Sequence, residues 1–241
     1  VIPANLDLSS NMAVQKCAPW SAGAEQGTDM VVHFIRHAEA ESNAAAHQHP
    51  RDSPGYLAAY ADEQFFDSAL SAKGQAQCWD LRKQCDTLRC EAIVCSPLRR
   101  TLQTAEWSLA THLSRDVPWY AVEAAREYSQ GHARPCDYRH SVEVQRSSFK
   151  RVDFSRVPLG KDTFASRKES VEDLDGRCRE LLQLLRDLPQ QHIAVVSHTG
   201  FLTHLFEHHL HWPPKQCAFS NAELRSVVLE FQEAEAGANC C

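Results

Sequence analysis

The sequence predicts an α/β protein, a three-layer sandwich in which helices cover both faces of a mostly parallel central sheet. Short apolar runs alternate with longer segments whose apolar residues recur at helical spacing. The apolar fraction of 43% over 241 residues suffices for a sizeable core. We therefore predict one domain over residues 29–232, between a flexible leader (1–28) and a C-terminal tail (233–241).

Five apolar runs have the length and composition of strands. Because they are short and almost continuously apolar, they fit strands that are buried on both faces, as in a parallel sheet. The predicted strands cover residues 30–35, 92–95, 119–122, 193–196 and 224–231.

Helices are predicted between these strands. Ser71 and Ser170 suit N-cap positions, and Ser96 followed by Pro97 has the form of a cap followed by a first helical residue. The predicted helices cover residues 39–46, 71–86, 96–112, 200–209 and a strongly amphipathic segment that begins at 170. Residues 47–70 have the Pro and Gly content of an inserted rim or lid, and 126–168 are predicted to be irregular.

Polar residues follow four of the predicted strands. They are Arg36-His37, the segment 96–100, Glu127, and Ser197-His198-Thr199. Ligands of parallel α/β sheets bind beyond the carboxyl ends of the strands, so these groups are expected at one rim.

The predicted rim holds side chains that suit a phosphate group. Arginine forks match phosphate oxygens, and a neutral imidazole can attack phosphorus to form a phosphohistidine. A protonated carboxyl group can give its proton to the leaving oxygen. With arginines and a second, cationic histidine supplying positive charge, this chemistry needs no metal. Arg36-His37 taken alone also fits a metal site or an ordinary exposed pair.

Three motifs in order, FIRHAEAESN, SPLRRTLQTAE and VVSHTGFLTHL, resemble those of the histidine phosphatase superfamily, which includes the cofactor-dependent phosphoglycerate mutases. The similarity covers roughly residues 30–231. The stretch AREYSQGHARPCDYRHS resembles a phosphoglycerate mutase-like branch found in plants and fungi.

This resemblance implies a role for each matching residue. His37 corresponds to the phosphorylated histidine, Glu127 to the acid that protonates the leaving group, and His198 to the second histidine. The residues that would contact phosphate are Arg36, Arg99, Asn43 and Thr199. Where the family usually has Gly after the Arg-His pair, this chain has Ala38, which we expect to be tolerated; the alternatives are that its methyl group narrows the pocket or marks a lost activity.

Other candidates remain open between a substrate contact and surface charge. Arg100 either binds substrate or faces solvent on its helix. Arg134 and Arg139 either reach a second anionic group of the substrate or are surface charges, and Glu123 is an alternative to Glu127.

The histidine-rich run HLFEHHLHW places His204 and His208 on one helical face. Glu207 is not in the order that helical zinc motifs require. We expect packing and a polar surface there, with no metal and no cofactor.

Composition bears on partners and on function. A net charge of −6 disfavours a general nucleic-acid or anionic-membrane binder, and the ten cysteines are predicted to be reduced and buried in a cytoplasmic protein. We predict a metal-independent phosphomonoesterase that acts on a small phosphorylated metabolite. The alternatives are a phosphoglycerate mutase-type transferase and an inactive phosphate-binding domain. The sequence leaves the oligomeric state open.

Overall fold

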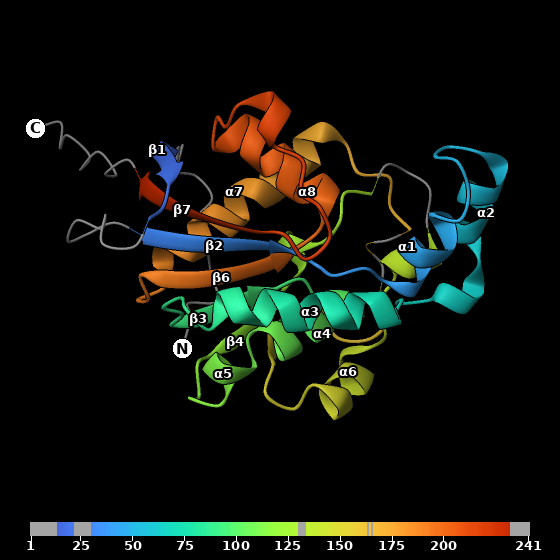
Figure 1. Cartoon of the computed structure of the whole chain (residues 1–241), viewed down its shortest axis with the longest axis horizontal. Helices are drawn as coiled ribbons and strands as arrows, with labels where there is room; N and C mark the ends of the chain where they lie inside the picture. The colour runs from blue at the N-terminus through green and yellow to red at the C-terminus, as the bar shows by residue number, and fades with distance from the viewer. Residues whose placement is uncertain (1–13, 22–29, 130–133, 163, 165, 232–241) are drawn as a thin grey trace, which may run out of the picture.

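The computed structural model describes residues 14–21, 30–129, 134–162, 164 and 166–231. Its centre is a seven-stranded sheet with the order β1-β7-β2-β6-β3-β4-β5 (Figure 1). The neighbouring strands β2, β6, β3, β4 and β5 run parallel to one another, whereas β7 pairs antiparallel with both β2 and β1. The strands are β1 (Val14–Pro19), β2 (Met30–Arg36), β3 (Ala92–Cys95), β4 (Trp119–Val122), β5 (Asp153–Arg156), β6 (His192–Ser197) and β7 (Leu224–Phe231). The predicted fold class and all five predicted strands are confirmed.

Two strands were not predicted, and both lie at an edge of the sheet. β1 falls inside the predicted leader, yet it pairs with β7 from Val14 opposite Phe231 to Pro19 opposite Val227. β5 falls inside the segment predicted to be irregular. Edge strands are only partly covered, so neither has the continuous apolar run that marks the central strands. For Val14–Pro19 the leader prediction is therefore wrong, and the predicted tail 233–241 lies outside the described residues.

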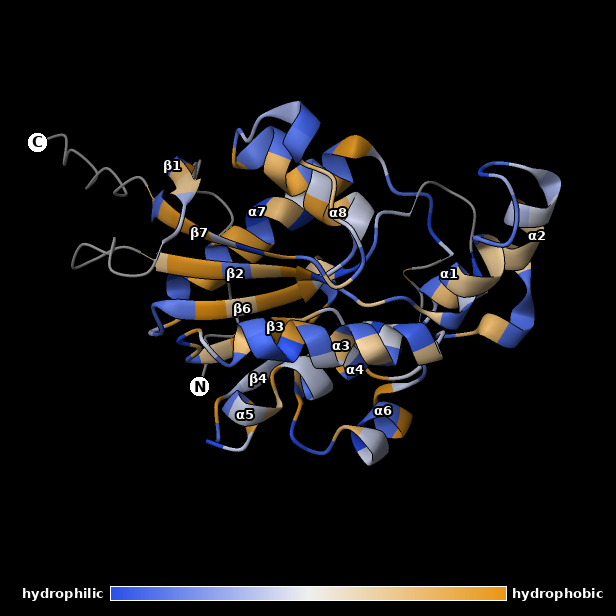
Figure 2. Cartoon of the chain, in the orientation of Figure 1, coloured by the Kyte–Doolittle hydropathy of each residue, from blue (hydrophilic) through white to orange (hydrophobic). Residues whose placement is uncertain are grey.

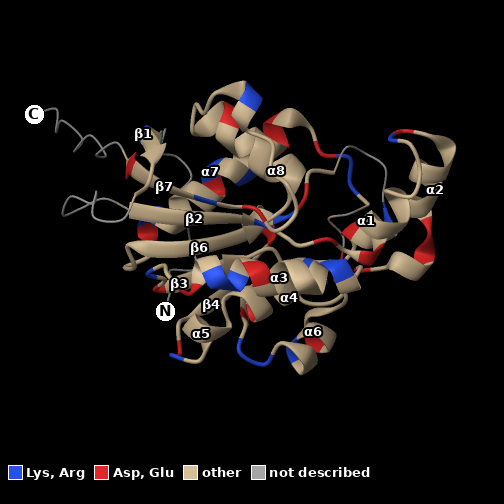
Figure 3. Ribbon diagram, in the orientation of Figure 1, with Lys and Arg blue, Asp and Glu red and all other residues tan. Residues whose placement is uncertain are grey.

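The central strands alternate their side chains between two apolar cores. In β3, for example, Val94 packs on one side of the sheet and Ile93 on the other. Figure 2 shows how apolar β2, β6 and β7 are, and Figure 3 shows few charged residues on these central strands. β2, β3 and β6 are buried on both faces, as the sequence pattern predicted, whereas most residues of β7 are half-buried.

Helices cover each face (Figure 1). One face is covered by α7 (Val171–Asp187), α8 (Thr199–His204) and η4 (Leu205–His209), a turn of π-helix. The other is covered by α3 (Ala72–Cys85), α4 (Arg99–Ser108), α5 (Ala110–Leu113) and α6 (Val142–Ser148). The short 3-10 turns are η1 (Glu63–Phe65), η2 (Glu123–Ala125), η3 (Pro135–Asp137) and η5 (Pro214–Gln216).

Two small helices lie beyond the carboxyl end of β2 (Figure 1). They are α1 (Glu41–Ala46) and α2 (Pro54–Ala61). α2 lies inside the predicted insertion, and its N-cap residue Ser53 accepts a hydrogen bond from the Tyr56 amide. The insertion therefore has regular structure of its own at this end of the sheet.

The start of α4 differs from the prediction. The helix begins at Arg99, three residues after Ser96, and its N-cap residue Leu98 provides no side-chain hydrogen bond. The Asp67 carboxylate takes that role by accepting a hydrogen bond from the Arg99 amide at 2.8 Å. Ser96 is instead hydrogen-bonded to the ring of His198. By contrast, the predicted caps Ser71 and Ser170 both accept N-terminal amides of their helices.

The cysteines and the helix lengths bear on the predictions of reduced thiols and of no membrane association. All eight cysteines within the described part of the chain are free, and seven of them are buried. None of the described helices combines the length and the apolar character that a bilayer crossing needs.

Gly74 provides a test of the packing between α3 and the loop after β2. A β-carbon at this position would lie 2.0 Å from the carbonyl oxygen of Glu39. We expect Gly74→Ala to lower the free energy of unfolding by about 1–3 kcal/mol, because backbone has to move. Gly176→Ala in α7 is the control, since no atom lies within 4 Å of its β-carbon, and it should raise stability by about 0.5–1 kcal/mol. Urea unfolding measures both, and equal effects would contradict the packing.

Candidate active site

A cleft of about 1020 Å³ lies at the carboxyl ends of the parallel strands. It brings together most of the residues singled out in the sequence. Those that line it are Arg36, His37, Asn43, Arg100, Glu127, Arg134 and Thr199. His198 lies directly behind, with its ring centroid 5.0 Å from that of His37. Arg99 and Arg139 are not among the lining residues.

The main chain around His37 is held from two directions. Its amide donates to the Ser197 carbonyl at 3.0 Å, which extends the pairing of β2 with β6. Its carbonyl accepts from the Ala222 amide at 3.3 Å and from the Asn221 side chain at 3.1 Å. The position of the ring is therefore fixed by the sheet and by the loop before β7.

The His37 ring is oriented for attack through one nitrogen. Nδ1 lies 2.7 Å from the Ala38 carbonyl oxygen, which can only accept, so Nδ1 carries the proton. Nε2 is then unprotonated, and its lone pair accepts a hydrogen bond from Nε of Arg100 at 3.3 Å. Burial, followed by the charges of Arg100 and Arg36, holds the pKa of His37 well below its usual value. The result is a neutral imidazole whose Nε2 is unprotonated.

Arg100, and not Arg99, is the arginine of α4 that reaches the site. Its buried guanidinium donates to Asp137 at 2.9 Å, to the Cys136 carbonyl, and to Nδ1 of His198 at 3.1 Å. Arg99 is exposed, so its predicted role is wrong. Neighbouring helical residues point about 100° apart. Only Arg100 shares the face of Thr104, whose hydroxyl accepts the Ala38 amide at 3.0 Å.

The hydrogen bonds of His198 fit a neutral ring, whereas the predicted cationic ring refers to the site with a phosphoryl group bound. Its Nδ1 accepts from Arg100, so Nε2 carries the proton and donates to Ser96 at 2.8 Å. Burial and the Arg100 charge hold the pKa of His198 well below its usual value. A bound phosphate dianion would act in the opposite direction and raise that pKa.

Arg36 has hydrogen-bonding capacity left for a ligand. Nη1 donates to the Phe219 carbonyl at 2.7 Å, whereas the buried Nε has no partner among the described residues. The Asn43 side chain has less hydrogen-bonding capacity left, because it accepts a hydrogen bond from the Ala40 amide at 3.1 Å and donates one to Tyr60 at 2.9 Å. It lines the cleft while joining α1 to α2.

Glu127 lies on the wall of the cleft, in the segment that follows β4. Its Oε1 accepts the amides of Tyr128 at 2.8 Å and of Phe201 at 3.1 Å. Burial and the nearby negative charge of Asp137 raise the pKa of this carboxyl group, against the effect of these hydrogen bonds and of Arg100. With Oε1 engaged, Oε2 is the oxygen that can carry a proton toward a ligand.

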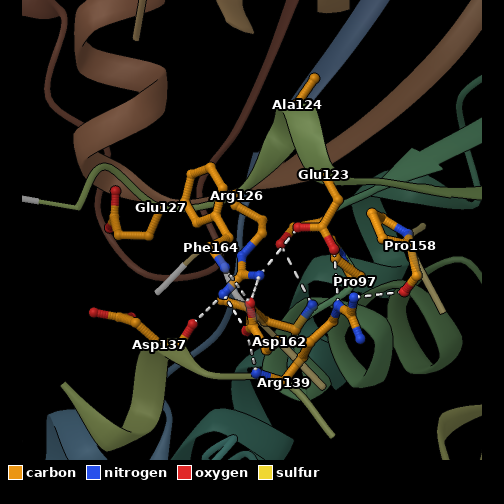
Figure 4. Close-up of polar contacts among 12 residues, drawn as sticks. Pro97, Glu123, Ala124, Arg126, Glu127, Asp137, Arg139, Pro158, Asp162 and Phe164 are labelled. Atoms are coloured by element: carbon orange, nitrogen blue, oxygen red, sulfur yellow. Dashed lines mark hydrogen bonds and ion pairs between the residues drawn. The ribbon is translucent and has the colours of Figure 1, made fainter. Parts of the chain in front are cut away.

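A buried ion-pair network holds the segment around Glu127 (Figure 4). Arg126 binds both oxygens of Asp162, at 2.9 and 2.7 Å, and contacts Glu123 at 3.0 Å. Arg139 donates to the other oxygen of Glu123 at 2.7 Å. Glu123 is therefore a structural carboxylate and not the alternative acid. The predicted substrate contact by Arg139 is wrong, since its guanidinium is committed to Glu123 and to carbonyl oxygens.

Arg177 of α7 is a second positioning residue that the sequence analysis did not identify. It forms a bidentate pair with Glu169 and donates to the carbonyl oxygens of Ala124 at 2.9 Å and Arg126 at 2.8 Å. An arginine inside an otherwise apolar helical face was the available signal. It lies at the turn between Leu174 and Leu181, where leucine or cysteine otherwise predominates.

Two further predictions concern the rim. Arg134 lies 4.7 Å above the Tyr60 ring and has no ion pair within the described part of the chain.

Ala38 is fully buried against Leu70 and Cys78 and is not among the cleft residues. Its methyl group therefore packs away from the cavity and does not narrow it.

Two neutral histidines, a buried arginine and a carboxyl group of raised pKa at one cleft are the groups that phosphoryl transfer requires. The family model described as "Histidine phosphatase superfamily (branch 1)" matches residues 32–238. The chain belongs to the histidine phosphatase superfamily, whose members are phosphatases and mutases.

Known proteins of this superfamily are similar along most of the chain. A "Phosphoglycerate mutase-like protein" of Arabidopsis thaliana is 29% identical, and the match covers 82% of this chain and 83% of that protein. The fold resembles the α-ribazole phosphatase of Shigella flexneri, at a TM-score of 0.51 and 20% identity over 83% of this chain and 95% of that one. It also resembles the ecdysone phosphate phosphatase of Bombix mori in complex with tungstate, at a TM-score of 0.54 and 14% identity over 74% and 76%.

Binding of an oxyanion tests whether Arg100, in place of Arg99, contacts the phosphate group. Arg100→Lys keeps the charge beside Asp137 but removes the guanidinium fork. We expect it to weaken tungstate binding about 30-fold or more, which corresponds to the ~2 kcal/mol lower limit for disrupting a buried charge contact. Arg99→Lys should leave binding unchanged. Calorimetric titration with tungstate measures both, and a larger loss in Arg99→Lys would reverse the assignment.

Proposed function

We propose that the protein is a metal-independent phosphomonoesterase for a small phosphorylated metabolite, acting through a phosphohistidine on His37. The observation that carries the proposal is the state of the His37 ring. A proton on Nδ1, an unprotonated Nε2 whose only hydrogen bond within the described residues is the 3.3 Å contact from Arg100, and a depressed pKa together suit a nucleophile at neutral pH. Arg36 and Arg100 border the position that the phosphoryl oxygens would take.

The first chemical step breaks the ester bond. Nε2 of His37 attacks phosphorus, and the bond between phosphorus and the ester oxygen breaks with both electrons going to that oxygen. Protonated Glu127 gives its proton to the departing oxygen, so the product leaves as a neutral alcohol. The charge of the transferring group is met by the guanidinium groups of Arg36 and Arg100.

The second step regenerates the enzyme. Glu127, now a carboxylate, takes a proton from water as the water oxygen attacks phosphorus, and the bond between phosphorus and Nε2 breaks. Inorganic phosphate leaves, and Glu127 is protonated again. One residue thus acts as acid and then as base, which suits a carboxyl group with a raised pKa.

Transfer to a second hydroxyl, as in a mutase, is the alternative outcome of the same intermediate. Arg134 is the observation that favours it, because this rim arginine forms no ion pair with the described residues and suits a second anionic group on the substrate. The size of the cleft favours hydrolysis, since about 1020 Å³ leaves room for water beside a small phosphate ester. The ratio of isomerised 3-phosphoglycerate to released phosphate distinguishes the two.

An inactive phosphate-binding domain is the third alternative. The substitution of Ala for the usual Gly at residue 38 was its only support. Because the methyl group of Ala38 packs against Leu70 and Cys78, that support is weak.

Removal of the nucleophile is the direct test of the proposal. We expect His37→Ala to reduce kcat for an aryl phosphate by roughly 10⁴-fold or more and to abolish acid-labile phosphate on the denatured protein. The exposed His211 provides the matched control, as His211→Asn, because Asn tolerates its positive φ of 52°. If His37→Ala retained most of its activity, His37 would not be the phosphorylated nucleophile.

The pH dependence follows from the two shifted groups. Turnover of an alkyl phosphate needs neutral His37 and protonated Glu127. As pH rises through the raised pKa of Glu127, kcat/KM falls, and this decrease should lie above the ordinary range of a glutamic acid. As pH falls, His37 stays neutral because its pKa is depressed. The decrease of kcat/KM at low pH should therefore lie below the ordinary pKa range of histidine.

The role of Glu127 is separated by leaving-group chemistry. Glu127→Gln should lose about 10²–10⁴-fold in kcat with alkyl phosphates, whose leaving oxygen needs the proton. It should lose far less with 4-nitrophenyl phosphate, whose leaving group departs as an anion. Equal losses with both esters would assign Glu127 a purely structural role.

A further inference from the structure

A second cluster of chemically able side chains lies on the face covered by α7 and α8. It joins Asp175 of α7 with His204 at the end of α8 and His209 at the end of η4. Nε2 of His204 and Nε2 of His209 both approach Oδ1 of Asp175, at 2.7 and 2.9 Å. The side chains are 13%, 14% and 31% exposed for His204, His209 and Asp175, so a solvent ion can reach them.

The π-helical turn is what brings the two histidines together. In an α-helix residues five apart point about 140° away from each other, and the sequence accordingly paired His204 with His208. In η4 the Leu210 amide donates to the Leu205 carbonyl five residues earlier, at 3.0 Å. This wider turn brings the ring of His209 to 6.0 Å from that of His204, on the side of Asp175. The ring of His208 lies 4.4 Å from that of His204, as predicted, but it is exposed beside Glu207. Single π-turns inside helices occur frequently at functional sites.

The geometry points to a zinc-binding site formed by Asp175, His204 and His209. Two imidazole nitrogens and one carboxylate oxygen are a donor set that Zn²⁺ takes, with the fourth position left to water. One ligand atom from each residue lies within 4.8 Å of the other two. Zinc bonds of about 2.0–2.2 Å place tetrahedral ligand atoms about 3.3–3.6 Å apart. The histidines therefore need to withdraw from Oδ1 by less than 1 Å on average.

The site adjoins the cleft but is separate from the groups assigned to chemistry. His204 lines the cleft together with Thr203 and Glu207. On α7, Asp175 lies two residues before Arg177, which holds the carbonyl oxygens next to Glu127. Zinc would thus clamp α7 to α8 and η4 beside the active site. Its expected effect is on stability and on KM, and not on the reaction at His37.

Zinc titration of the full chain, purified in the presence of a chelator and then freed of it, tests the site. Wild-type protein should bind one equivalent of Zn²⁺ and show a raised Tm. Asp175→Asn and His209→Ala should each weaken zinc binding at least about 10-fold. Their Tm without zinc shows that each variant is folded. Wild-type protein that binds no zinc overturns the proposal.

Two controls distinguish this site from other zinc ligands. His37→Ala and His211→Asn should bind zinc as the wild type does, because neither side chain belongs to the cluster. Substitution with Co²⁺ should give a spectrum without a thiolate charge-transfer band, since the proposed ligands are nitrogen and oxygen. Loss of zinc binding in His37→Ala, or a thiolate band, would assign the ion to the catalytic histidine or to a cysteine and overturn the proposal.

Discussion

The buried guanidinium of Arg100 is the constraint around which the site is built. It contacts both catalytic-site histidines, at 3.3 Å and 3.1 Å, and is anchored by Asp137 and the Cys136 carbonyl. A buried charge without a partner is strongly destabilising, so the segment that carries Asp137 has to lie against α4 for the chain to fold. The same contact brings the loop after β2, the start of α4 and the start of α8 to one point. Assembly of the site is therefore coupled to the packing of the domain.

This cation also lowers the pKa of both histidines. Burial and then the Arg100 charge hold the pKa values of His37 and His198 well below their usual value, whereas burial and Asp137 raise the pKa of Glu127 against the effect of Arg100. The proposed reaction uses these opposite shifts, with His37 as nucleophile and Glu127 as acid. A phosphate dianion would accept from Nε of Arg36, which has no partner within the described residues, and its negative charge would lie beside Arg100.

The sequence predicted what depends on local pattern, and it missed what depends on contacts between distant segments. Central strands and the caps at Ser71 and Ser170 follow from composition and spacing, and each is present in the structure. Edge strand β1 has no such pattern, because it is defined by its partner β7. Arg99 and Arg100 are adjacent in a motif, and only the tertiary orientation of α4 distinguishes them. The pairing of His204 with His209 requires a π-turn, for which periodicity at 3.6 residues gives no signal.

Arg126 and Arg177 position the main chain at Glu127 without contacting its carboxyl group, so they do not lower its pKa through a direct ion pair. Arg177 reaches the carbonyl oxygens of Ala124 and Arg126, and its own charge is met by the bidentate carboxylate of Glu169. The charge of Arg126 is likewise met by Asp162 and Glu123 (Figure 4). Had either guanidinium contacted the Glu127 carboxylate, it would have stabilised the anion and lowered the pKa of the group. Both arginines hold the main chain through neutral carbonyl oxygens, and the charge of each is balanced elsewhere. They therefore fix Glu127 in place while burial raises the pKa of its carboxyl group.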